Sequence, residues 1–455
     1  MSGLARALPF CLLCLLTACS ITDRRPELLA EHLPPALETD THRLDRDWWK
    51  AYNDAPLNQL VAMALAGNID LAKSAISVNR ALYRANLIGA DLVPAFSGEL
   101  SGSASRMIND GSPSNRSVGG SLGVGYELDL WRRLADRASA GEWEYAATTQ
   151  DLEATRLALV NNMVDVYFNL SYLDEAIQVT EATIANYRRI LTIASARFAG
   201  GKSAAVEPAQ ARQSLLAAEN NLLDLRTRRN TAGQTLRDLL NLTPDQQPDI
   251  RCTSLLDIRM PEMDLDVPLA VLGNRPDLRA AERRLQAAFK DLSAMEKSWY
   301  PSVTLGATLS SSSNHFRTAF DVPLLGGSIR INLPFLDWNR VYWNVKLSEA
   351  DFDAVRLDFI RSVASALNEV DAARFAHAQA GIAVANTDEK YRYDQQITAY
   401  HRQRWDLGAG ELSDLLQAMN TEASSRLALL SSRYDQIRSG SLLCKALAGR
   451  YTRTL

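Results

Sequence analysis

The sequence predicts a mainly α-helical chain with a membrane β-barrel portion, built as two copies of one helix–hairpin–long helix plan. Three observations predict this fold class. One constant shift aligns the two halves of the chain, four short Gly- and Ser-rich segments alternate like strands, and long proline-free stretches fit very long helices. The chain has 455 residues, 47% hydrophobic and 22% charged, with 49 Lys and Arg against 53 Asp and Glu. This composition is ordinary for a folded protein, and its near-neutral charge argues against nucleic acid as the main partner.

The N-terminus has the pattern of a secretory signal peptide, in which Arg6 precedes an apolar run and small residues come before Cys19. Leu16-Thr17-Ala18-Cys19 also resembles a bacterial lipobox. We therefore expect residues 1–18 to be removed and Cys19 to be lipidated, so that acyl chains hold the protein at a membrane. The alternative is a plain signal peptide in which the cysteine is incidental. Beyond these residues no apolar run approaches the roughly 18 residues of a membrane-spanning helix, which excludes a polytopic helical membrane protein.

A shift of 207 residues aligns the two halves of the chain, for example Asp70-Leu71 with Asp277-Leu278. Several of the other matches are Pro or Gly residues, which commonly end helices and strands. The other matches are Pro94 and Pro301, Gly119-Gly120 and Gly326-Gly327, Trp131 and Trp338, Arg133 and Arg340, Arg197 and Arg404, Gly201 and Gly408, and Gln210-Ala211 and Gln417-Ala418. Duplication of one unit explains this agreement better than chance does.

Each copy begins with a helix and continues with two strands. We expect the helices from Leu57 to Ile88 and from Leu269 to Lys297. The strand segments mix Gly and Ser with alternating apolar residues, and each has about the 9–11 residues that a tilted membrane strand needs. They are Val93–Met107, Ser117–Leu130, Ser302–Ser313 and Gly326–Phe335.

Very long helices follow the strands in both copies. No proline occurs from Ala140 to Phe198, roughly 90 Å of helix, and the counterpart runs from Trp343 to Trp405. After a short break the helices resume, near Pro208 to Leu240 and Leu412 to Leu447. Apolar residues repeat with the spacing of a coiled-coil seam: Leu152, Leu159, Met163, Val166, Leu170, Leu173 and Ile177, then Leu412, Met419, Ala423, Leu427, Leu430, Tyr434 and Ile437. A structural coiled-coil lipoprotein without a pore is the alternative of another class, but it leaves the four strand segments unexplained.

Four strands per chain cannot close a barrel, and an open sheet edge is not tolerated in lipid. Because known barrels begin at eight strands, two chains would form a narrow tube and three would supply twelve strands. The sequence therefore predicts a tube made from several chains, without fixing their number.

Several motifs recur in a fixed order along the chain: Trp48-Trp49 with Asp54-Ala55-Pro56-Leu57, Asn68-Ile69-Asp70-Leu71, Tyr126-Glu127-Leu128-Asp129-Leu130-Trp131, Asn274-Arg275-Pro276-Asp277-Leu278, Pro334-Phe335-Leu336-Asp337, and residues 408–418. Together they resemble the TolC-like outer-membrane factor family, most closely the lipoprotein branch of tripartite (RND-type) efflux systems. The resemblance covers nearly the whole mature chain.

The resemblance implies a homotrimer in the cell outer membrane, with a 12-stranded β-barrel continued by an α-helical tunnel in the periplasm. It implies a passive exit duct for drugs, toxic small molecules or ions, in contact with outer-membrane lipids and working with a periplasmic adaptor protein and an inner-membrane pump. The duct of an ABC-driven type I protein secretion system is the alternative within transport. The expected division is 19–92 (lipidated N-terminus, equatorial segment and first helix), 93–130 (first hairpin), 131–240 (tunnel helices), 241–299 (inter-repeat equatorial segment and helix), 300–336 (second hairpin), 337–449 (tunnel helices) and 450–455 (C-terminal tail).

The resemblance also assigns the far end of the long helices. The adaptor-docking tip would hold the two turn-arounds, with Arg197, Gly201, Lys202, Arg404, Gly408 and Gly410. Glycine suits such reversals because it tolerates positive φ. Acidic residues after the second turn-around ring the pore entrance in the family; Asp414 holds the first such position, Gln417 stands where a second acid is common, and Glu207 is the counterpart in the first copy. The alternative role of Asp414 is to favour the N-terminus of its helix.

The cysteines divide between processing and structure. Cys11 and Cys14 leave with the signal peptide, Cys19 is the lipidation site, and Cys252 and Cys444 remain as an even pair. In an oxidising compartment this pair forms either a disulfide or two buried thiols. The resemblance places both residues in or near the equatorial belt, which favours their pairing.

The sequence predicts no enzyme, no cofactor and no metal site. Gly201-Lys202-Ser203 looks like the end of a phosphate-binding loop, but Ala196 stands where that loop needs glycine. The histidines lack the spacing of metal ligands: His32, His42, His315, His377 and His401.

Overall fold

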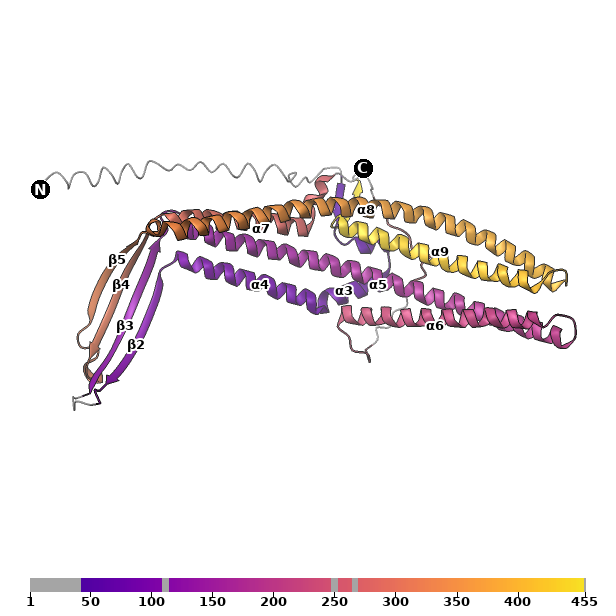
Figure 1. The fold of residues 1–455 in the computed structure, drawn as a ribbon, viewed down its shortest axis with the longest axis horizontal. Helices are drawn as coiled ribbons and strands as arrows, with labels where there is room; N and C mark the ends of the chain where they lie inside the picture. Colours follow the sequence, from indigo (N-terminus) through magenta and orange to yellow (C-terminus); the bar gives the residue numbers. More distant parts are fainter. Residues whose placement is uncertain (1–41, 109–113, 247–252, 264–268, 454–455) are drawn as a thin grey trace.

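The computed structural model describes residues 42–108, 114–246, 253–263 and 269–453. The molecule is elongated, with a β-sheet at one end and helices that run from it to a distant helical tip (Figure 1). Helices and strands follow a similar order twice: one or two helices, two strands, a very long helix and a shorter one. Short 3₁₀ turns join them at Trp48–Tyr52, Ala90–Leu92, Leu269–Asn274, Lys297–Trp299, Phe316–Thr318 and Pro334–Asp337.

The sheet is antiparallel, with the strand order β2-β3-β4-β5. Its strands are β2 (Ala95–Ser105), β3 (Asn115–Leu128), β4 (Ser302–Ser313) and β5 (Leu324–Asn332). The predicted strands are confirmed to within a few residues, and β4 has the predicted bounds. The central pair β3–β4 joins the two copies, with Ser121 opposite Ser310. Within the described strands, β2 and β5 each pair on one side only, so both edges of the sheet are open.

The predicted first helix is two helices, α3 (Ala55–Gly67) and α4 (Ile69–Gly89), which meet at Asn68 with a bend of 43°. The expectation of one continuous helix was wrong because Asn68 caps α4: its side-chain oxygen accepts a hydrogen bond from the Leu71 amide at 2.9 Å. Its amide nitrogen also donates to the Leu239 carbonyl at 2.9 Å, which holds the break in place.

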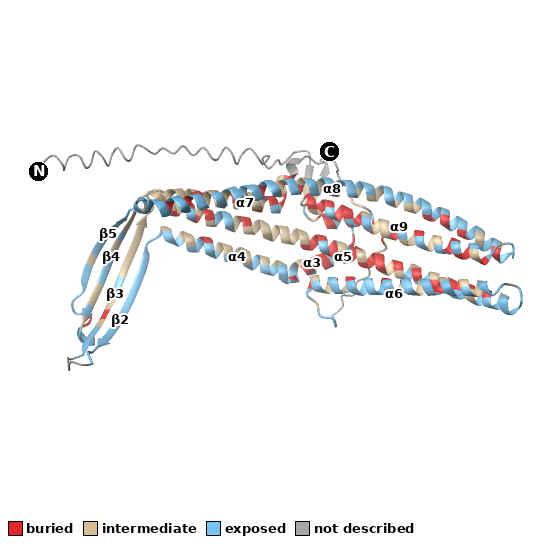
Figure 2. Ribbon diagram, in the orientation of Figure 1, coloured by how far each residue is buried: buried red, intermediate tan, exposed pale blue. Residues whose placement is uncertain are grey.

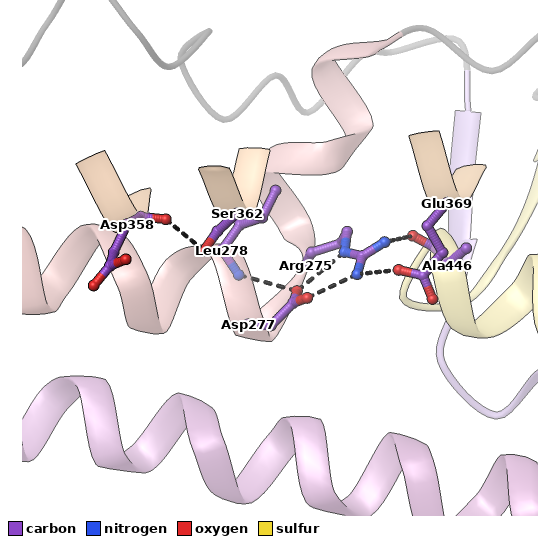
Figure 3. A network of polar contacts seen from close by, with 7 residues as sticks. All are labelled: Arg275, Asp277, Leu278, Asp358, Ser362, Glu369 and Ala446. Atoms are coloured by element: carbon purple, nitrogen blue, oxygen red, sulfur yellow. Dashed lines mark hydrogen bonds and ion pairs between the residues drawn. The ribbon is translucent and has the colours of Figure 1, made fainter. Parts of the chain in front are cut away.

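The counterpart helix is shorter than predicted. Helix α7 spans Pro276–Glu296 and begins at Pro276, since a proline at the first position starts a helix and the residue before it, Arg275, is extended. Arg275 is buried and binds three elements at once: it donates to Asp277 at 2.7 and 3.0 Å, to Glu369 at 2.7 Å and to the Ala446 carbonyl at 3.0 Å (Figure 3). The motif around Arg275 thus joins the start of α7 to the two C-terminal helices.

Two helices of extreme length carry the molecule away from the sheet. Helix α5 (Arg133–Ala199) has 67 residues and α8 (Trp338–Asp406) has 69, each about 100 Å long at 1.5 Å per residue. The returning helices are α6 (Val206–Leu240) and α9 (Leu412–Ala446). The predicted seam residues of both copies are buried or half-buried, which confirms the coiled-coil spacing.

The largest core lies half-way along the molecule, where red residues gather on α3, α5 and α9 in Figure 2. Trp48 and Tyr167 are fully buried there. The Tyr167 hydroxyl donates to the buried carboxylate of Asp54, with O–O distances of 2.8 and 2.9 Å. The same carboxylate caps α3 by accepting from the Leu57 amide at 2.9 Å. The Trp-Trp and Asp-Ala-Pro-Leu motifs are therefore core anchors.

A two-stranded ribbon joins the ends of the described chain, β1 (His42–Asp45) with β6 (Arg450–Arg453). The predicted C-terminal tail therefore contains a strand, which the Arg450–Asp45 ion pair at 3.3 Å fastens to β1. Among the described helices, none alone has the length and apolarity to cross a membrane; α3 and α4 together, bent as they are, meet that criterion only by length and composition.

Candidate functional site at the helical tip

The first turn-around reverses the chain between α5 and α6 through a glycine cap. The Lys202 amide donates to the Arg197 carbonyl at 2.8 Å, and the Gly201 amide donates to the Phe198 carbonyl at 2.9 Å. Gly201 has φ +66°, the left-handed conformation that this cap requires. The two bonds satisfy carbonyls at the end of α5 that would otherwise lack partners.

The second turn-around, between α8 and α9, has the same geometry. The Ala409 amide donates to the Arg404 carbonyl at 2.9 Å, and Gly408 has φ +74°. The Arg404 guanidinium then donates to the Ala409 carbonyl at 2.8 Å and closes the turn. A side chain at Gly410 would meet the Arg404 Cβ at 3.1 Å, so this position needs glycine for space. The predicted glycines are thus confirmed as turn residues, while their part in docking stays a prediction.

Arg197 joins the two turn-arounds. Its guanidinium lies 4.5 Å from the centre of the buried Trp405 ring, and Nη2 donates to the Trp405 carbonyl at 3.4 Å. A cation over an aromatic face is attracted by the ring's negative face, and more strongly when water is excluded. Arg197 therefore links the tip of α5 directly to the tip of α8.

A separate apolar cluster packs beneath this link. It draws on four helices and contains Ile184, Tyr187, Ile190, Ala194, Ala211, Leu215, Trp405, Leu412, Leu415, Leu416 and Met419. The Tyr187 hydroxyl donates to the Asn420 side chain, and burial raises the pKa of Tyr187 to about 12. The tip is thus a packed unit with its own small core.

Asp414 lies exposed in the first turn of α9, beside a cleft of about 290 Å³ between α8 and α9. Gln417 lines the same cleft, together with His401 and Asp394. Burial raises the pKa of Asp394, but hydrogen bonds from Lys390 and Ser425 outweigh it and hold that pKa below its usual value. The structure thus brings Asp414 and Gln417 together.

Glu207 lies half-buried in the first turn of α6, the position that corresponds to Asp414 in α9. It does not line the cleft that holds Asp414. Both acids also stand where a helix N-terminus favours negative charge. The pore-entrance roles of Asp414, Gln417 and Glu207 stay predictions.

The remaining predicted sites divide between described and undescribed parts of the chain. Cys444 is buried and has no disulfide partner among the described residues; its Sγ lies 3.6 Å from the Met263 Sδ, and burial raises the pKa of its thiol to about 12. Cys19 and Cys252 lie outside the described residues, so lipidation and the disulfide stay predictions. Across the described ranges, no three His, Cys, Asp or Glu side chains gather in a metal-binding arrangement.

A family model described as outer membrane efflux protein matches the chain twice, at residues 60–242 and 267–449. The chain belongs to this family. The two matched segments begin and end 207 residues apart, the same shift that aligns the halves of the sequence.

Curated relatives and solved structures agree with this membership of the family. Toxin and drug export protein A from Aggregatibacter actinomycetemcomitans is 45% identical over 414 residues, which cover 91% of each chain. The cation efflux system protein CusC of Escherichia coli is 26% identical over 98% of each chain. The Campylobacter jejuni CmeC outer membrane channel shares the fold with a TM-score of 0.83, at 22% identity, over 89% of this chain and 88% of that one.

The sequence did not predict the roles of two residues of the tip. There, Trp405 marks only the expected end of a helix, and His401 is only one of five histidines without the spacing of metal ligands. Both lie close to the second turn-around in the sequence, and a helical projection of α8 against α9 was the available signal for His401. No sequence signal pointed to the Arg197–Trp405 contact, because 208 residues separate its partners.

Proposed function

We propose that this chain is one third of a homotrimeric channel in the outer membrane, which forms the passive exit duct of a tripartite efflux pump. The observation that carries the proposal is the open sheet at one end of helices about 100 Å long, in a member of the outer membrane efflux protein family. The substrates would be drugs, toxic small molecules or ions. An adaptor protein and an inner-membrane pump would supply the connection and the energy.

The open edges of the sheet support an assembly of several copies. In hydrocarbon each unpaired amide or carbonyl costs several kcal/mol, so β2 and β5 need partners. Both strands are mostly exposed and carry large apolar side chains, among them Phe96, Leu100, Ile329 and Ile331. Three copies would give twelve strands, an even number within the range of known barrels.

The names of two relatives support export of harmful compounds. One relative at 45% identity is named for toxin and drug export, and another at 26% is named for cation efflux. The name of the relative at 45% identity is also compatible with the alternative, protein secretion by an ABC-driven exporter, because a wide duct can serve more than one kind of pump. Lipidation of Cys19 would anchor the N-terminus in the same membrane, and this part of the proposal rests on the lipobox alone.

Planar-bilayer recording of the purified protein tests the duct directly. A conducting pore is expected, whereas the absence of current at every voltage would favour a structural scaffold. In cells, deletion of the gene should raise the accumulation of a fluorescent dye such as ethidium, and the wild-type chain should restore its export. Capture of the inner-membrane partner after crosslinking then separates the two transport alternatives. An ABC exporter without an efflux pump among the captured proteins would refute the efflux assignment.

A further inference from the structure

Three sulfur-containing side chains and one imidazole meet on one face of α9, beside the largest core. Gly440 of α9 is buried, and a β-carbon built there would lie 3.2 Å from the Met263 Cε and 3.4 Å from the Met260 Cε. The His377 Cε1 would lie 3.3 Å from the same point. One turn further along α9, the Cys444 Sγ lies 3.6 Å from the Met263 Sδ. These side chains form a soft-ligand cluster of Met260, Met263, His377 and Cys444, for which the glycine leaves room.

The two methionines lie on residues 253–263, which the chain fastens on two sides. The Arg433 guanidinium of α9 donates to the Leu255 carbonyl at 3.2 Å and also binds the Ile258 carbonyl. From the other side, the Leu255 amide donates to the Glu175 carboxylate of α5 at 2.6 Å. These bonds hold the segment and its two methionines against α9.

The imidazole comes from α8 and is held in one tautomer. The Ser439 hydroxyl donates its only proton to the Gln436 carbonyl at 2.9 Å, so its oxygen accepts from the His377 Nδ1, which is 3.3 Å away. The proton is therefore on Nδ1 and the lone pair on Nε2, and a second hydrogen bond of this kind is usual for a histidine that binds a metal. Burial also lowers the pKa of His377, which keeps the ring neutral near pH 7.

We propose that the soft-ligand cluster binds a soft monovalent metal ion, of the class of Cu(I) and Ag(I). Thiolate and thioether sulfurs prefer soft metals, and imidazole also binds copper. Hard ions such as Ca²⁺ and Mg²⁺ take oxygen ligands, and zinc sites use Cys, His and carboxylates, so two thioethers favour neither class. The cluster has one Cys and one His, and so differs from the groups of three His, Cys, Asp or Glu that the described residues lack. The inference does not depend on the proposed duct.

The spacing of two of the sulfurs suits a shared ion. Two metal–sulfur bonds of about 2.3 Å, at a tetrahedral angle of about 109°, would place the sulfurs about 3.8 Å apart. The Cys444 Sγ and the Met263 Sδ are 3.6 Å apart, and without metal the thiol donates its proton to the thioether. On binding, the S–H bond breaks, the proton leaves to water, and the thiolate sulfur bonds to the ion. The other two ligand atoms, the Met260 Sδ and the His377 Nε2, are each one bond from an atom that reaches Gly440.

The cluster is accessible on one side and buried on the other. Three of its members are half-buried, whereas Cys444 is only 4% exposed, so an ion would pass the methionines before it reaches the thiol. A bound ion would join residues 253–263 to α8 and α9 and stabilise the folded chain, because the unfolded chain lacks this arrangement of ligands. Packing without metal is the competing role, since methionine fills irregular gaps in cores. Leucine would then serve equally well at both methionine positions.

Equilibrium dialysis against Ag⁺ in chloride-free buffer tests the site in the untagged full-length protein. We expect a single tightly bound Ag⁺ per chain. M260L/M263L should raise the dissociation constant by about tenfold or more, because even indirect partners of metal ligands change metal affinity about 10- to 100-fold. Leucine has nearly the volume of methionine, so this variant should fold. M63L/M419L removes two methionines elsewhere in the chain and, as the matched control, should stay close to the wild type.

Three results of the dialysis would overturn the proposal. They are a wild-type protein that binds no Ag⁺, a dissociation constant of M260L/M263L equal to that of the wild type, and an equal loss of affinity in the M63L/M419L control. The cysteines give a further comparison: C444S should lose tight binding and C252S should keep it. Loss of binding in C252S but not in C444S would also overturn the proposed ligands.

Thermal unfolding and X-ray absorption test the same ligands without relying on C444S. Ag⁺ should raise the Tm of the wild type and of M63L/M419L more than that of M260L/M263L, because only a chain that binds the ion is stabilised by it. Equal shifts in all three proteins would show that the methionines only pack. With Cu(I), X-ray absorption should show sulfur neighbours and a nitrogen neighbour, and H377Q should lose the nitrogen. A copper shell without sulfur would overturn the proposal.

Discussion

Removal of the Arg197 side chain should loosen the helical tip. In the structure its guanidinium lies 4.5 Å from the centre of the Trp405 ring, which is 4% exposed, and its bond to the Trp405 carbonyl is long at 3.4 Å. A desolvated cation–ring contact contributes about 1–2 kcal/mol, and the long hydrogen bond adds little. Since 1.4 kcal/mol corresponds to a factor of ten, R197A should raise the frequency of tip opening about tenfold.

Hydrogen exchange of the cap amides provides the assay. The amides of Lys202 and Ala409 are protected by their bonds to the ends of α5 and α8, so local opening exposes both. W405F is the matched variant: the Trp405 ring nitrogen has no hydrogen-bond partner in the described structure, so this change weakens the ring's attraction without breaking a bond. We expect W405F to give a smaller increase than R197A. Exchange rates in R197A within twofold of the wild type would refute the reasoning.

Three further predictions concern the pore entrance, the core and an ion-pair cluster. D414N should lower the cation selectivity of the channel in reversal-potential measurements, and E207Q should have less effect; equal effects would remove the special position of Asp414. Y167F leaves the buried Asp54 carboxylate without its hydroxyl donor and should lower the free energy of unfolding by about 2–3 kcal/mol in urea titrations. Burial raises the pKa of Asp136, but hydrogen bonds from Lys297 and Ser293 and the charges of Lys297 and Lys290 outweigh it and hold that pKa below its usual value. This stabilisation is fully present above the unfolded pKa of about 3.9 and is lost as the pH falls through the lower folded pKa, so D136N should destabilise at pH 7 and its difference from the wild type should shrink as the pH is lowered below that range.

Local signals in the sequence predicted most elements of the fold. Strand segments were recognisable because period-2 alternation and Gly-rich composition act within ten residues, and β4 has the predicted bounds, Ser302–Ser313. The long helices followed from the absence of proline and from the seam spacing. Helix ends were harder: the break at Asn68 depends on a capping bond, and the late start of α7 depends on Pro276. Asn68 and Pro276 can both be read in the sequence, but tertiary contacts decide whether each of them marks the end of a helix.

Long-range polar partners could not be predicted at all. Arg275 bonds to Glu369, which is 94 residues away, and the Arg197–Trp405 contact spans 208 residues. Their residue types are common, and only the fold selects these pairs from many equivalent ones. The cleft shared by Asp414 and His401 lies between these extremes: a helical projection places both residues near the second turn-around, but only the rotation of α8 against α9 brings them to one cleft.

The ribbon of β1 and β6 also bears on the order in which the chain folds. Asp45 and Arg450 pair across 405 residues, so the first described strand has no ladder partner until almost the whole chain has been delivered. Loop-closure entropy rises slowly with length, so this arrangement costs little in stability and more in time. A chain halted before Arg450 would keep β1 unpaired, with its backbone groups open to proteases and to other chains. The ribbon of β1 and β6 can therefore form only after the strand that contains Arg450 has been synthesised.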